Sequence, residues 1–167
     1  CTSYASVSGA ESVGGIIGQL IDSSATIENC HNFGEVTATN TYGYVGGIIG
    51  YCGAGNNSLL SLSNSSNHAL IQGVNYVGGI AGSLSSTTGE IFNCYNVGEI
   101  ISQESYAGGI VGREYSSYGK NNIYNCYNEG KITSSSGYAG GIAGYACDVY
   151  YSYNIGTIIC GGNYSGG

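Results

Sequence analysis

Hydrophobic and glycine positions recur along this chain at a regular interval. A block with a Gly-Gly pair, an isoleucine and a further glycine begins at residues 13, 45, 77, 107 and 139, so its copies are 30–32 residues apart. The five copies are VGGIIG at 13–18, VGGIIG at 45–50, VGGIAG at 77–82, AGGIVG at 107–112 and AGGIAG at 139–144. A fixed period of this length indicates a solenoid, in which each repeat forms one coil and stacks on the next.

A second block lies between the copies of the first. It reads IENCHNFGEV at 27–36, LSNSSNHALI at 62–71, IFNCYNVGEI at 91–100, IYNCYNEGKI at 123–132 and VYYSYNIGTI at 149–158. The copy at 62–71 is degenerate, because Ser65 and Ser66 replace Cys-Tyr and Ala69 replaces glycine. Together the two blocks resemble the GLUG-motif repeats of bacterial extracellular and adhesin-like surface proteins, over essentially the whole chain. That resemblance implies an extracellular repeat region, and it carries no active-site residues with it.

Each repeat contains three short segments with the character of a strand. In one repeat they are 13–18, 27–30 and 35–37, with glycine and asparagine between them. Strands this short need neighbours above and below to be stable. We therefore predict an all-β parallel β-solenoid (β-helix) of about five coils with three strands per coil, forming a single repeat domain over residues 1–167. Crossover sterics favour right-handed coils, and the repeat pattern predicts ends without distinct caps.

Stacked coils would place equivalent hydrophobic residues in three columns. The columns are Ile16, Ile48, Ile80, Ile110 and Ile142; Ile27, Leu62, Ile91, Ile123 and Val149; and Val36, Ile71, Ile100, Ile132 and Ile158. We expect these side chains to form the core. In an extended 13–18 segment, alternation leaves both faces apolar or bare, which predicts that loops, tyrosines or a second chain cover it. Lateral or end-to-end self-association is therefore one hypothesis.

An asparagine recurs once in every coil. The column is Asn32, Asn67, Asn96, Asn128 and Asn154. Asparagine tolerates left-handed turn conformations, and identical amides one coil apart can hydrogen-bond to each other, so we predict a turn ladder. The glycines two residues later, Gly34, Gly98, Gly130 and Gly156, are expected to supply positive φ angles.

Tyrosines also recur in columns. Tyr44, Tyr76, Tyr106, Tyr138 and Tyr164 each lie two residues before a Gly-Gly pair or its equivalent, and Tyr95, Tyr127 and Tyr153 start a second column. Stacked aromatic rings would stabilise a rod by about 0.5–1.5 kcal/mol per pair. The alternative is that the columns form a flat aromatic face that binds glycans or a neighbouring solenoid.

Four of the seven cysteines share one column. They are Cys1, Cys30, Cys94 and Cys126, with Ser65 and Ser152 at the remaining positions. We expect buried free thiols, because the parallel Cβ vectors of stacked coils suit a disulfide poorly. Cys52, Cys147 and Cys160 lie outside this column, and their pairing stays open. No C-x-x-C spacing occurs, so no zinc or redox site is predicted.

The few basic residues and the negative net charge exclude some classes of binding partner. The net charge is −7 and the chain has three Lys or Arg residues, so we expect no nucleic-acid binding, and no apolar run is long enough for membrane insertion. The acidic residues form no catalytic cluster: Glu35 and Glu99 share a column but are separated by Leu70. His31 and His68 occupy different columns without an evident partner. We therefore expect no catalysis, no metal and no cofactor.

These features predict a structural rather than a catalytic role. The first hypothesis is an extracellular or cell-surface repeat module that forms a stalk, an adhesin shaft or a self-assembling filament subunit, with a second copy of itself as partner. The second is a module that binds carbohydrate or a host surface through exposed tyrosine ladders. An ice-binding face is disfavoured, because the relevant column mixes Thr37 and Thr133 with glutamine and isoleucine.

Overall fold

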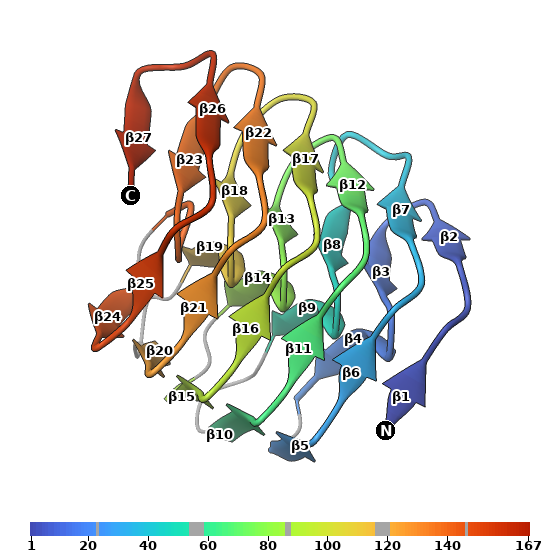
Figure 1. Ribbon diagram of the computed structural model, residues 1–167. Coiled ribbons are helices and arrows are strands. Elements are labelled where there is room, and N and C mark those ends of the chain that lie inside the picture. The colour runs from blue at the N-terminus through green and yellow to red at the C-terminus, as the bar shows by residue number, and fades with distance from the viewer. Residues whose placement is uncertain (23, 54–58, 86–87, 116–120, 146) are drawn as a thin grey trace.

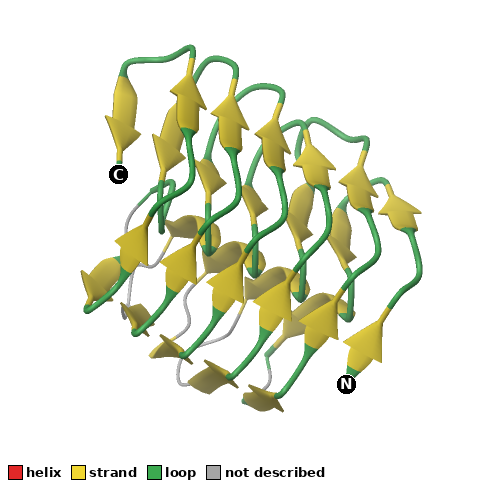
Figure 2. Ribbon diagram, in the orientation of Figure 1, coloured by secondary structure: helices red, strands yellow, loops and turns green. Residues whose placement is uncertain are grey.

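A computed structural model shows a β-solenoid without helices; it describes residues 1–22, 24–53, 59–85, 88–115, 121–145 and 147–167. All strand pairs among these residues are parallel and join equivalent positions of successive repeats, as in the pair Ile71↔Ile100. Figures 1 and 2 show the coils stacked from the N-terminal to the C-terminal end of the chain. The five sheets hold four to six strands each, in agreement with about five predicted coils.

The first two sheets form consecutive sides of the coil. The first contains β1 (Thr2–Ser3), β6 (His31–Asn32), β11 (Ser66–Asn67), β16 (Tyr95–Asn96), β21 (Tyr127–Asn128) and β25 (Tyr153–Asn154). The second contains β2 (Val7–Gly9), β7 (Val36–Ala38), β12 (Ile71–Gly73), β17 (Ile100–Ser102), β22 (Ile132–Ser134) and β26 (Ile158–Cys160).

The remaining three sheets complete the coil. The third contains β3 (Ser12–Gly14), β8 (Tyr44–Gly46), β13 (Val77–Gly78), β18 (Ala107–Gly108), β23 (Tyr138–Gly140) and β27 (Tyr164–Gly166). The fourth contains β4 (Ile17–Ile21), β9 (Ile49–Gly53), β14 (Ala81–Ser85) and β19 (Val111–Tyr115). The fifth contains β5 (Ala25–Glu28), β10 (Leu59–Ser63), β15 (Thr88–Phe92), β20 (Asn121–Tyr124) and β24 (Asp148–Tyr150).

The prediction of three strands per coil is wrong, because a typical coil has five. Two sharp corners divide the predicted segments. The GGI-x-G segment bends after its first glycine: a Cβ on Gly46 would lie 2.0 Å from the carbonyl oxygen of Ile49, so only glycine fits. The second block turns at Asn93 and its equivalents, which adopt left-handed φ angles near 50°.

The bend also corrects the expectation that both faces of the GGI-x-G segment need an outside cover. Val45, Ile48 and Ile49 are all fully buried within the chain itself. Val45 belongs to one hydrophobic cluster with Val36 and its column, whereas Ile48 and Ile49 belong to a second cluster with the Ile27 column. The solenoid therefore has two separate cores, and the bent segment contributes to each.

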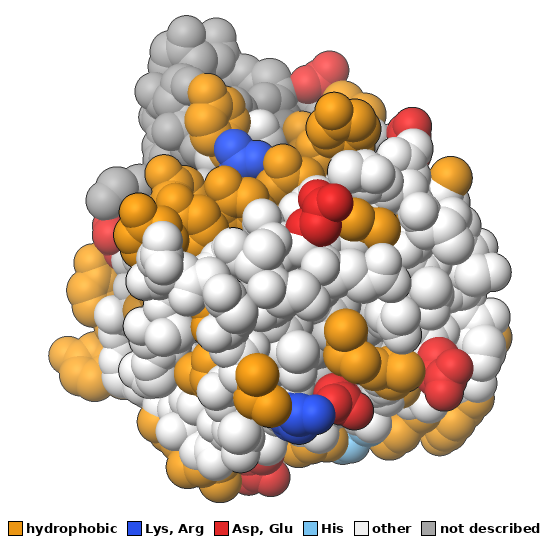
Figure 3. Space-filling model, turned by 90° about the horizontal axis from the view of Figure 1, so that it is seen from above, with side chains coloured by type: hydrophobic (Ala, Val, Ile, Leu, Met, Phe, Trp, Pro, Cys, Tyr) orange, Lys and Arg blue, Asp and Glu red, His pale blue; other side chains and the backbone are white. Residues whose placement is uncertain are grey.

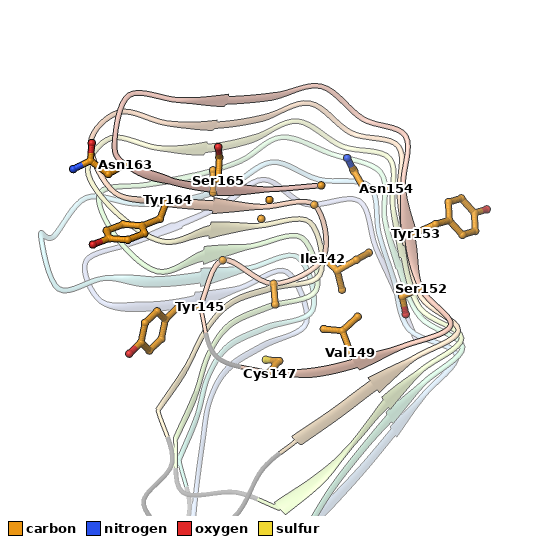
Figure 4. A pocket seen from close by; sticks show the side chains of 17 residues that line it. Ile142, Tyr145, Cys147, Val149, Ser152, Tyr153, Asn154, Asn163, Tyr164 and Ser165 are labelled. Atoms are coloured by element: carbon orange, nitrogen blue, oxygen red, sulfur yellow. The ribbon is translucent and has the colours of Figure 1, made fainter.

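The three predicted hydrophobic columns line these two cores. Residues of the middle coils, such as Ile80, Ile91 and Ile100, are completely buried, and burial decreases toward the ends of the stack. The cross-section in Figure 4 shows two lobes that meet near Asn154. Among the described residues there is no helix long and apolar enough to cross a membrane.

Candidate functional site

The asparagine column forms a continuous ladder between the two cores. Each side-chain nitrogen donates a hydrogen bond to the amide oxygen one coil further on, at 2.8 Å from Asn32 to Asn67 and 2.7 Å in the next three steps. The same nitrogen also donates to the carbonyl oxygen two residues ahead, as Asn96 does to Gly98 at 2.8 Å. Because both amide hydrogens are used internally, the ladder is a structural element.

The prediction that the ladder asparagines and the glycines after them form left-handed turns is wrong. Left-handed φ angles occur one corner earlier, at Asn29, Asn64, Asn93, Asn125 and Tyr151, and no described glycine has a positive φ. The ladder asparagines instead lie in short strands. Glycines such as Gly130 are required for a different reason, since a Cβ there would lie 2.0 Å from the carbonyl oxygen of Gly98 in the preceding coil.

The structure places the predicted cysteine column in register, but not all of it is buried. Cys30, Cys94 and Cys126 are buried, whereas Cys1 is exposed because no described coil covers it. All described cysteines are free thiols, including Cys52, Cys147 and Cys160. Hydrogen bonding with Cys126 and burial raise the pKa of the Cys94 thiol, and burial raises the pKa of Cys52 to about 11. Cys94 and Cys52 are therefore poor nucleophiles.

A buried carboxyl group escaped the sequence analysis. Glu114 follows Leu20, Cys52 and Leu84 in one inward-facing column and is 3% exposed. Its carboxylate accepts hydrogen bonds from the backbone and side-chain nitrogens of Asn121, both at 2.7 Å. Burial raises the pKa of Glu114, and the two bonds from Asn121 oppose that shift. Among the described residues no group of acidic, histidine and cysteine side chains could hold a metal ion.

The two histidines meet through a serine. His31 Nδ1 and His68 Nε2 lie 2.8 Å and 2.9 Å from the Ser66 hydroxyl oxygen. Burial and the neighbouring His31 lower the pKa of His68. His68 also stacks on Phe33 at 4.5 Å and thereby continues a column of rings. Neither histidine has an acidic hydrogen-bond partner among the described residues.

The predicted tyrosine columns stack as continuous ladders. Centroids of successive rings are 5.0, 5.3, 4.9 and 4.5 Å apart from Tyr44 through Tyr76, Tyr106 and Tyr138 to Tyr164. The second column, Tyr95–Tyr127–Tyr153, has spacings of 5.0 and 5.3 Å. Phe92 and Tyr124 form a further stacked pair, which was not anticipated, at 5.2 Å.

Stacking changes what the first ladder can present to a ligand. Neighbouring rings cover one another's faces, so the inner members offer ring edges and hydroxyl groups rather than the flat face of the alternative hypothesis. Figure 4 shows Tyr145 and Tyr164 with their hydroxyl ends directed away from the coil. A cavity of about 640 Å³ lies in the last described coil. Ile142, Cys147 and Val149 are among the side chains that line it (Figure 4).

A second column from the adjoining sheet lies against this ladder. It contains Gln19, Tyr51, Ser83 and Arg113, followed by Tyr145. Tyr51 packs on Tyr44 at 4.8 Å, and Tyr145 contacts Tyr106 and Tyr138 edge-on at 5.6 and 5.3 Å. Arg113 lies between Tyr51 and Tyr145 in this column, and its guanidinium carbon is 5.0 and 5.3 Å from the ring centroids of Tyr76 and Tyr106. We call the five-tyrosine ladder with Tyr51, Arg113, Tyr115 and Tyr145 the aromatic strip.

The fold and its unbroken side-chain columns define a parallel β-solenoid repeat module. Comparison with known families agrees at one copy of the repeat: residues 9–37 match the family model described as the GLUG motif. This match confirms the resemblance to a GLUG-motif repeat region that the blocks indicated. No curated protein and no solved structure matches the chain.

Proposed function

We propose that this chain is an extracellular structural repeat module that acts as a stalk, an adhesin shaft or a self-assembling filament subunit at a cell surface. One observation carries the proposal: the asparagine ladder and the five parallel sheets run along the same axis and join successive coils. Such an arrangement resists bending and shear, because each coil is tied to the next through backbone and side chain alike. The resemblance to GLUG repeats supports the extracellular setting.

The amino-acid composition supports a structural role. Uncharged polar residues and glycine dominate, and charged residues make up 8% of the chain. The proposal includes no catalysis, no cofactor, no nucleic-acid partner and no membrane insertion. A second copy of the chain is the partner in the filament version, because coils with the same period and side-chain columns can stack on an identical coil.

Electron microscopy of the purified chain, with light scattering at several concentrations, tests this proposal. Straight rods whose length grows with concentration are expected for the filament version, and single short rods for the stalk or shaft. Flexible or irregular particles would contradict both versions. A longer chain with duplicated repeats should give rods of about twice the length, because length in a solenoid adds coil by coil.

A second candidate function is supported by the aromatic strip. Its tyrosines are half-buried or exposed, with Tyr115 and Tyr164 both 58% exposed, so their hydroxyl groups are accessible. A module that binds carbohydrate at a cell or host surface could use this row of hydroxyls as hydrogen-bond donors and acceptors. Titration of neutral and acidic oligosaccharides, followed by tyrosine fluorescence and calorimetry, tests this candidate.

A further inference from the structure

Arg113 occupies an unusual position for a cation in an acidic chain. Its guanidinium carbon lies 5.0, 5.3 and 4.9 Å from the ring centroids of Tyr76, Tyr106 and Tyr115. The equivalent residue of the preceding coil is the small, buried Ser83, which leaves room for the arginine to reach back over Tyr76. All three centroids lie within the distance range of cation–π contacts, and packing among these rings restricts the orientation of the guanidinium.

The hydrogen-bonding capacity of this guanidinium is unused within the described part of the chain. Its Nε is buried and has no hydrogen-bond partner, and the salt bridge found among the described residues joins Lys131 to Glu99 instead. Glu114, the next residue, points the opposite way into the core, where Asn121 binds it. Arg113 therefore has no carboxylate partner among the described side chains, although the chain has ten acidic residues.

A guanidinium held in this way is suited to one kind of ligand group. Its outer N–H groups can bind both oxygens of a carboxylate in the bidentate arrangement that arginine favours. The rings of Tyr76, Tyr106 and Tyr115 lie around the guanidinium, and their phenol hydroxyls are groups that can bind the hydroxyl groups of a sugar. The ladder continues along the axis to Tyr44 and Tyr138, so an extended chain of sugars has further hydroxyls to meet on both sides.

We propose that Arg113 and the surrounding tyrosines form a binding site for the carboxylate of an acidic glycan that lies along the aromatic strip. The inference rests on the second candidate function, glycan binding, and names its ligand class. Because the net charge of the protein is −7, a glycan with isolated carboxylates between neutral sugars fits better than a uniformly charged polymer. Figure 3 shows a basic side chain within a patch of hydrophobic side chains, with acidic side chains scattered over the same face.

The experiment compares two matched oligosaccharides on the intact protein. One alternates glucuronate with N-acetylglucosamine, and the other is the same oligomer with its carboxyl groups reduced to alcohols. Calorimetry should show that the acidic oligomer binds about tenfold or more tightly, as expected for a charge-assisted hydrogen-bonded pair. Glucuronate alone should bind more weakly than the oligomer, because it does not contact the neighbouring tyrosines.

Variants assign the effect to the arginine. Arg113→Gln should remove the preference for the acidic oligomer, and Arg113→Lys should retain part of it because the charge stays while the planar fork is lost. Lys131→Gln removes the same charge elsewhere and should leave binding unchanged. Thermal unfolding of each variant shows whether it is folded, and the comparison of the two oligomers on the unmodified protein does not depend on any variant.

The outcomes separate this inference from the function on which it rests. Equal binding of both oligomers would overturn the assignment of Arg113 as a carboxylate site and leave glycan binding in place. Binding of neither oligomer would overturn both. A preference for the acidic oligomer that persists in Arg113→Gln would also overturn the inference, since the carboxylate would then be recognised elsewhere.

Discussion

Gly79 and Asn96 lie in direct contact across the narrow waist between the two cores. A Cβ built on Gly79 would lie 2.6 Å from Cγ of Asn96 and 2.1 Å from the carbonyl oxygen of Gly109. The same relationship recurs in other coils, as between Gly47 and Asn67 and between Gly109 and Asn128. The second glycine of each GGI-x-G block and the ladder asparagine are therefore two parts of one packing element.

The first prediction concerns this contact. Gly79→Ala should lower the free energy of unfolding by about 2 kcal/mol or more, because the added methyl group overlaps the side chain of Asn96 and backbone that cannot move independently. Gly166→Ala is the matched control, since a Cβ there meets nothing within 4 Å. Urea unfolding followed by circular dichroism measures both. Equal stability of the two variants would show that the waist is less tightly packed than described.

The second prediction concerns the asparagine ladder. Asn96→Ala removes the acceptor of Asn67 and the donor to Asn128, which leaves buried polar atoms unpaired, so stability should fall by about 1–3 kcal/mol. Asn154→Ala, at the half-buried end of the ladder, should cost less because water can replace the lost partner. Thermal unfolding of both variants tests the order. A larger loss at Asn154 would contradict the ladder as the main stabilising element.

The third prediction concerns Glu114. Its raised pKa means that folding favours the protonated carboxyl, so its stabilising contribution is present below the ordinary value of 4.5 and is lost as the pH rises through the folded-state value. Glu114→Gln should therefore be more stable than the unmodified protein at neutral pH, and the difference should shrink on acidification. Melting temperatures measured across the pH range test this. Glu129→Gln, at an exposed position, is the control for the removal of one carboxylate.

The fourth prediction concerns the thiols. At about pH 8.5, the usual pKa of a free thiol, an alkylating reagent should modify the exposed Cys1 in the native protein. Cys52, Cys94 and Cys126 should react only after denaturation, because they are buried and the pKa of Cys52 and of Cys94 is raised. Mass spectrometry of peptides locates the modified residues. Rapid labelling of Cys94 in the native state would contradict the closed core.

The fifth prediction concerns aromatic stacking. Tyr127 has a ring on each side, at 5.0 Å and 5.3 Å, so Tyr127→Leu should lose about 1–3 kcal/mol from two stacked pairs. Tyr42→Leu is the control, because that side chain is 73% exposed and has no ring contact among the described residues. Chemical denaturation of the two variants tests the difference. Similar stability would show that the ladder contributes little beyond its burial.

The sequence by itself determined the register of this protein. Identical residues repeated at a nearly constant interval can all be buried or paired at once only if the coils stack in parallel, which is why the Ile48 column, the Asn96 ladder and the Tyr106 ladder were predictable. The family match at residues 9–37 covers one copy of this repeat. Periodicity relates one coil to the next, and this relationship does not depend on the path of the chain within a coil.

The path within a coil was decided only by the tertiary structure. The chain bends at Gly46, turns in a left-handed conformation at Asn93 and encloses two separate cores. These features depend on which segments of one coil face each other across the interior. The repeat pattern carries no information about such contacts, because it relates equivalent positions of different coils. The environments of Arg113 and Glu114 were also decided by the tertiary structure, because each of these residues differs in type from the rest of its column. Their environment comes from contacts between sheets, where steric fit and desolvation decide which side chain is covered.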